Sequence, residues 1–150
     1  MKLRFTKRDG KYDALAIDRD DGTTETIACP KQGIIPHDMV HYAVESVLGH
    51  SGFLSLLEQG QAARAAFGAA SEEAVERLVE TFQAEMWGGR VPAADLLATY
   101  SHACDVRGHD ALPVSLAAID AIRARLDMLT ARWSALPVND VMILEFDRPS

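Results

Sequence analysis

Residues 1–30 read MKLRFTKRDGKYDALAIDRDDGTTETIACP, and they contain three short segments with strand character, separated by two Asp-Gly turns. Apolar and polar residues alternate in residues 2–6, residues 12–18 follow the turn at Asp9-Gly10, and residues 23–29 are rich in Thr and Ile. Alternation places one set of side chains on one face of a strand, and Gly supplies the positive φ that a tight hairpin needs. The pattern therefore predicts a three-stranded antiparallel meander.

The remainder of the chain has mostly helical patterns. Pro36 and Gly49 are residues typical of a helix start and a helix end, which predicts a helix up to about Leu48. Further helices are expected over 53–57, from Ser71 to Gly88-Gly89, from Pro92 past Tyr100, and over 116–133. The alanine-rich residues 61–70 are suited to close helix packing, including packing between subunits.

Residues 141–146 are typical of a closing strand, which we expect to return to the N-terminal sheet because an isolated edge needs a partner. We therefore predict a single α+β domain over residues 1–150. A small antiparallel sheet, made of the N-terminal meander and the C-terminal strand, would pack against a layer of about four to five helices. A chain of 150 residues buries a core of its own without disulfides.

The charge of the chain bears on its partners and its location. The formal net charge is −7, which argues against nucleic acid and against anionic membrane surfaces as partners. No run approaches the ~18 apolar residues that span a membrane. No secretory signal is visible either, so we expect Cys29 and Cys104 to be reduced and the protein to be cytoplasmic.

One segment carries residues suited to chemistry, and it reads IIPHDMVHYAVE over residues 34–45. His37 and His41 are one helical turn apart, and Glu45 is one turn further on, so all three lie toward one side of a helix. The candidate metal ligands are His37, His41 and Glu45, and Asp38 is the residue that would orient a ligand histidine or act on water.

One straight helix does not complete such a site. A rise of 1.5 Å per residue separates His37 from Glu45 by about 12 Å along the axis. A further ligand must come from elsewhere, and the sequence does not select among its candidates, which are Glu58, Glu80, Glu85, His102, Cys104 and His109.

A structural interpretation of the same residues is also open. The helical wheel places the polar set at the edge of the apolar stripe, running toward solvent. Asp38 complements the helix dipole in the first turn, and His41 with Glu45 forms a surface pair.

The spacing His37-Asp38-x-x-His41 also matches the zinc-peptidase motif HExxH, except that Asp replaces Glu. A carboxylate one methylene shorter reaches less far toward a metal-bound water.

The stretch Ile35-Pro36-His37-Asp38-x-Val40-His41-Tyr42-x-Val44-Glu45, followed by Leu48-Gly49 and Gly52-Phe53, resembles a motif of small bacterial proteins of uncharacterised function. This PHDxVHxxVE-type motif covers about twenty residues here. The resemblance carries over no activity. It implies that His37, Asp38, His41 and Glu45 are the residues to test.

Two functional hypotheses follow, and the sequence does not decide whether the protein is an enzyme. The first is a non-catalytic, self-associating protein, a homo-oligomer in which His37, Asp38, His41 and Glu45 form a structural polar network. The alternative is a metal- or small-ligand-binding protein, including a metal-dependent hydrolase, with its site centred on His37 and His41. The cofactor that these residue types suggest is a divalent metal ion such as zinc.

Overall fold

The computed structural model describes residues 1–49, 53–58, 60 and 70–147. Within them, a four-stranded antiparallel sheet has the order β3-β2-β1-β4. The strands are β1 (Lys2–Thr6), β2 (Tyr12–Asp18), β3 (Thr24–Pro30) and β4 (Val141–Glu145). The predicted meander and the returning C-terminal strand are both confirmed, and with the helices they make an α+β fold.

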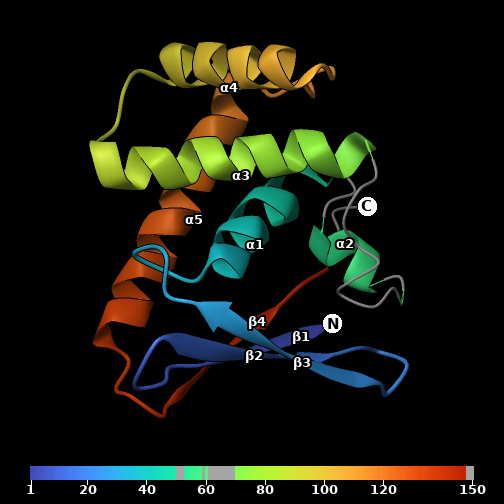
Figure 1. Ribbon diagram of the computed structural model, residues 1–150, viewed down its shortest axis with the longest axis vertical. Coiled ribbons are helices and arrows are strands. Elements are labelled where there is room, and N and C mark those ends of the chain that lie inside the picture. Colours follow the sequence, from blue (N-terminus) through green and yellow to red (C-terminus); the bar gives the residue numbers. More distant parts are fainter. Residues whose placement is uncertain (50–52, 59, 61–69, 148–150) are drawn as a thin grey trace.

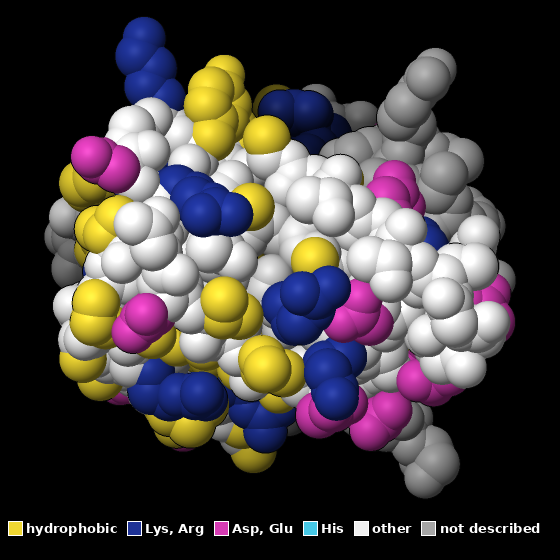
Figure 2. All heavy atoms as spheres, turned by 90° about the horizontal axis from the view of Figure 1, so that it is seen from below, with side chains coloured by type: hydrophobic (Ala, Val, Ile, Leu, Met, Phe, Trp, Pro, Cys, Tyr) yellow, Lys and Arg dark blue, Asp and Glu magenta, His cyan; other side chains and the backbone are white. Residues whose placement is uncertain are grey.

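The strand register gives the sheet one mainly apolar face. Six side chains lie in two rows across it and are at most 4% exposed: Leu3, Ile17 and Leu144 in one row, and Phe5, Leu15 and Met142 in the other. The opposite face carries hydrophobic side chains interspersed with Lys and Arg and with Asp and Glu (Figure 2). Tyr12, Val141 and Ile143 are the large apolar side chains that these strands leave exposed.

The helices cover the apolar face of the sheet (Figure 1). They are α1 (His37–Leu48), α2 (Phe53–Glu58), α3 (Ala70–Gly88), α4 (Ala93–Arg107) and α5 (Leu116–Ala135). Helix α1 lies between the sheet and α3, and it contacts α2, α3 and α5. Helix α4 packs on α3 and α5, on the side away from the sheet. Side chains on α1 are therefore covered from several directions.

The ends of α1 follow the local sequence. Pro36 is the N-cap residue with extended backbone angles, and His37 is the first helical residue. Gly49 ends the helix in the left-handed conformation, with φ 70°, and its N–H donates to the Glu45 carbonyl. Helix α3 begins slightly earlier than predicted, at Ala70.

Three other predictions concern the alanine-rich segment, the two cysteines and membrane-spanning helices. The alanine-rich packing segment falls on residues 61–69, which lie outside the described residues. Cys29 and Cys104 are both free and buried. Among the helices described, none is long and apolar enough to cross a membrane.

Candidate metal centre

Helix α1 presents His37 and His41 side by side. Their ring centroids are 4.9 Å apart, with the ring planes at 75° to each other. The spacing of four residues places both rings on the side of α1 that faces α3. His41 is 2% exposed, whereas the His37 side chain is 36% exposed. One imidazole is therefore buried, and its neighbour reaches the surface.

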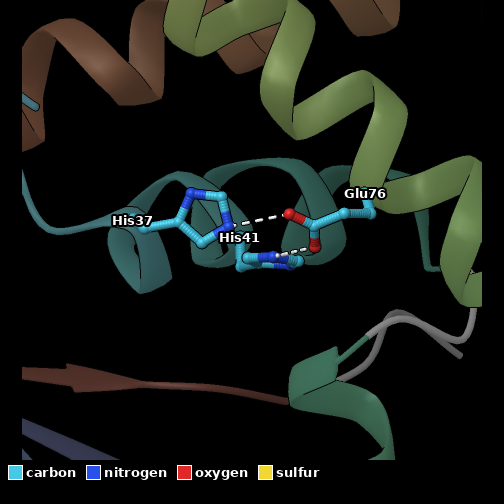
Figure 3. Close-up of side chains that lie close together, drawn as sticks. All are labelled: His37, His41 and Glu76. Carbon is cyan, nitrogen blue, oxygen red and sulfur yellow. Dashed lines mark hydrogen bonds and ion pairs between the residues drawn. The ribbon is translucent and has the colours of Figure 1, made fainter. Parts of the chain in front are cut away.

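The carboxylate that completes the cluster comes from α3. Glu76 Oε1 lies 2.8 Å from His37 Nε2, and Glu76 Oε2 lies 2.7 Å from His41 Nε2 (Figure 3). The Glu76 carboxylate thus contacts the Nε2 atom of both histidines. A carboxylate has no proton to donate, so each Nε2 donates in these contacts.

The other ring nitrogens are also held. His41 Nδ1 lies 3.0 Å from Glu45 Oε2, and His37 Nδ1 lies 3.0 Å from Gln83 Oε1 on α3. Both partners are acceptors, so each Nδ1 carries a proton. These bonds at Nδ1 fix the orientation of each ring, and they leave the Nε2 atoms directed at the Glu76 carboxylate.

Glu45 is a buried connector between α1 and α2. Its side chain is fully buried, and its Oε1 accepts the Ser55 backbone N–H at 3.0 Å and the Ser55 hydroxyl at 3.2 Å. Its Oε2 accepts the Leu54 N–H at 3.1 Å in addition to His41. The first turn of α2 is therefore fastened to the same carboxylate that orients His41.

The contacts with carboxylates shift the histidine and glutamate pKa values. Burial by itself would lower the pKa of His41, but the hydrogen bonds to Glu45 and Glu76 outweigh it and raise the pKa to about 10. Burial and the repulsion from His41 both oppose the charged form of His37, but the hydrogen bond and charge of Glu76 together with the hydrogen bond to Gln83 outweigh them, so the pKa of His37 is raised. Burial opposes ionisation of Glu76, yet its two histidine partners lower its pKa well below the usual range.

The geometry suits a metal ion. The His37, His41 and Glu76 ligand atoms all lie within 4.8 Å of one another. Two imidazole nitrogens and one carboxylate oxygen form a donor set that zinc accepts, with metal–ligand distances of about 2.0–2.2 Å. Ligand atoms of a tetrahedral ion stand about 3.3 Å apart, so an ion would require the Glu76 oxygens to move away from the Nε2 atoms that they now contact at 2.8 and 2.7 Å.

A cavity of about 520 Å³ opens beside His37. It lies between strand β3 and helices α1, α2 and α3, and His37 is the member of the donor set that lines it. The other lining residues are Ile27, Ala28, Cys29, Pro30, Gln32, Asp38, Phe53, Glu80 and Gln83. Within the cavity wall, the Cys29 thiol donates to Asp38 Oδ2 at 3.7 Å. Burial raises the pKa of Asp38, and it also raises the pKa of Cys29.

The structure brings the predicted residues together in a modified arrangement. His37 and His41 converge on one point, and Glu45 binds the far nitrogen of His41. Asp38 faces the cavity and Cys29. The wheel places His41 and Glu45 toward solvent, but both are buried because α2 and α3 cover that side of α1.

The proposed additional ligands lie elsewhere. Glu80 lines the cavity, Glu85 pairs with Arg123, and Cys104 is buried on α4. His102 is exposed on α4, and the Nδ1 of His109 contacts the Asp110 carbonyl. Glu58, at the end of α2, has an interaction of its own and does not belong to the cluster.

Sequence reasoning missed Glu76 and Gln83. The two residues are seven apart, so they share one face of α3 beside its buried stripe of Val75, Val79 and Phe82. The sequence did show that Glu76 and Gln83 repeat at the edge of the apolar stripe of this helix. That pattern does not indicate which other helix the two side chains face.

Comparisons with known proteins add no assignment. No protein family, no curated protein and no solved structure matches this chain.

Proposed function

We propose that this protein binds one divalent transition-metal ion through His37 Nε2, His41 Nε2 and the Glu76 carboxylate. The observation that supports it is the convergence of both Nε2 atoms on one carboxylate while each Nδ1 donates to an acceptor. An ion of charge +2 at this point would replace the two Nε2 protons and leave both rings as neutral ligands.

The residues behind the donors support the same proposal. A ligand histidine in a metal site nearly always donates its other N–H to a carboxylate or carbonyl oxygen, which fixes its tautomer. Glu45 and Gln83 fill these positions here. Three protein donors also leave a fourth position of a tetrahedral ion for water or a ligand, as in catalytic zinc sites. Zinc is therefore the first ion to test.

A structural network is the second candidate, and a specific observation favours it. Every ring nitrogen of His37 and His41 has a protein partner, and their contacts with Glu76 join α1 to α3 without any ion. Such a network by itself predicts ion pairs that hold the helices together and no bound metal. Self-association stays a prediction, and the molar mass from light scattering tests it.

The deciding experiment is metal content by mass spectrometry on protein purified without chelator. We expect close to one equivalent of metal in the parent, and its loss in a folded His37→Ala/His41→Ala double variant. Glu76→Gln should weaken zinc binding by about tenfold or more, since it removes the charged donor. The matched control is Glu73→Gln, an exposed residue on the same helix, which should bind zinc like the parent.

Two results would contradict the proposal. One is protein that takes up no metal after incubation with zinc, manganese or iron(II) salts. The other is zinc binding that Glu76→Gln leaves unchanged. In the first case the structural network becomes the better account of these residues.

A further inference from the structure

The cavity beside His37 has a distinct chemical character. Two carboxylates, Asp38 and Glu80, belong to its wall together with the amides of Gln32 and Gln83. Among the described residues that line it, none is Lys or Arg. Its volume of about 520 Å³ lies in the range of small-molecule sites.

The two carboxylates differ in how far their charge is already paired. Glu80 Oε1 accepts from the Arg77 guanidinium at 2.9 Å, and its side chain is 47% exposed. Asp38 accepts from the Cys29 thiol, a weak donor, at 3.7 Å. Asp38 is therefore the carboxyl group of the wall with more capacity left for a strong hydrogen-bond donor.

The neighbouring cluster does not offset this negative charge. With a divalent ion, two neutral imidazoles and the carboxylates of Glu76 and Glu45 sum to zero. With a proton on each Nε2 instead, two imidazolium rings and the same two carboxylates again sum to zero. The charge that a ligand meets is thus set mainly by Asp38 in either state, because Glu80 is already paired with Arg77.

The remaining wall is apolar. Ile27 and Phe53 line the cavity from β3 and α2. A hydrocarbon group gains from leaving water against such side chains, and a cation gains further from the face of an aromatic ring.

We propose that this cavity binds a small organic cation, with its ammonium group at the Asp38 carboxylate and its hydrocarbon part against Phe53 and Ile27. The inference deepens the proposed function and rests on it for what the ligand meets at His37, namely an imidazole bound to metal. Phosphate esters and carboxylic acids are disfavoured, because they would bring a second negative charge to an acidic wall.

Three probes with one carbon skeleton test the choice of charge: 3-phenylpropylamine, 3-phenylpropanol and 3-phenylpropanoate. Each is titrated at neutral pH into the ¹⁵N-labelled full chain, and amide shifts give both the affinity and the location. We expect the amine to bind about tenfold or more tightly than the acid, with the alcohol between them. The perturbed amides should belong to Ile27, Cys29, Asp38 and Phe53.

Variants test the anchor. Asp38→Asn keeps the shape of the side chain and should reduce the affinity of the amine by about tenfold. Asp120→Asn, an exposed carboxylate on α5, is the control and should bind like the parent. If Asp38→Asn does not fold, the comparison of the three probes in the parent still decides the matter. The proposal is overturned if the acid binds as tightly as the amine, if the shifts lie outside the cavity, or if a folded Asp38→Asn keeps the parent affinity.

The titrations are run on chelator-treated and zinc-loaded protein, which separates this inference from the metal centre. A chain that binds no zinc but still prefers the amine contradicts the metal proposal alone. A chain that binds zinc but prefers the acid contradicts the cation proposal alone.

Discussion

Replacing Glu45 by Gln tests whether the buried carboxylate holds the site together. The substitution keeps the shape of the side chain but exchanges one carboxylate oxygen for an NH₂ group. The two oxygens of Glu45 accept four donors: His41 Nδ1, the Leu54 and Ser55 N–H groups and the Ser55 hydroxyl. The glutamine amide offers one acceptor atom, so two of these donors would face an amide N–H instead.

The cost follows from those two lost bonds. A hydrogen bond to a charged group contributes about 1.5–3 kcal/mol, and a buried donor left without a partner is costly in itself. Removing one member of a buried ion pair costs about 3–5 kcal/mol, which is the loss of unfolding free energy that we expect here. For a chain of this size, this corresponds to a drop in Tm of roughly 10 °C.

Urea denaturation of chelator-treated protein, followed by circular dichroism, measures the effect. Glu73→Gln, which is exposed on α3, should change the unfolding free energy by less than about 0.5 kcal/mol. If Glu45→Gln costs no more than this control, the carboxylate does not fasten α1 to α2 as argued. Zinc affinity gives a second reading, because removal of a partner of a ligand histidine weakens binding by about 10–100-fold.

Three further predictions concern the pH response and two tertiary contacts. Because the pKa of His41 is raised to about 10 in the folded chain and is about 6.5 when unfolded, chelator-treated protein should lose stability as pH rises from 6.5 toward 10, and urea titrations of parent and His41→Gln should differ in that slope. Gly108→Ala should cost about 1 kcal/mol of unfolding free energy, since Gly108 ends α4 at φ 77°, and an unchanged urea midpoint would contradict this. Arg123→Met leaves Glu85 without its ion-pair partner between α5 and α3, and thermal denaturation should show a loss of about 3 kcal/mol, whereas a stability gain would contradict the assignment.

The strands and helix ends were predictable because local rules determine them. Alternation and the two Asp-Gly turns predicted the meander, and Pro36 and Gly49 predicted the limits of α1. The return of residues 141–146 to the N-terminal sheet was expected from the general need to cover a sheet edge, and the structure shows that the strand pairs with β1.

The candidate site was predictable only in part. The turn spacing of α1 makes His37 and His41 neighbours wherever that helix packs. The wheel showed which side of α1 they occupy, but not that α2 and α3 would cover it and bury Glu45. The same spacing explains why Glu45 is near His41 and not between the two rings.

The amino-acid sequence by itself thus determined the elements, the N-terminal meander and the pair of histidines, because each depends on residues close together in the chain or on one periodic pattern. Only the tertiary structure decided that Glu76 and Gln83 face them and that a cavity lined by Asp38 adjoins His37. The crossing of α3 over α1 fixes those contacts, and it results from the packing of buried side chains contributed by the whole domain.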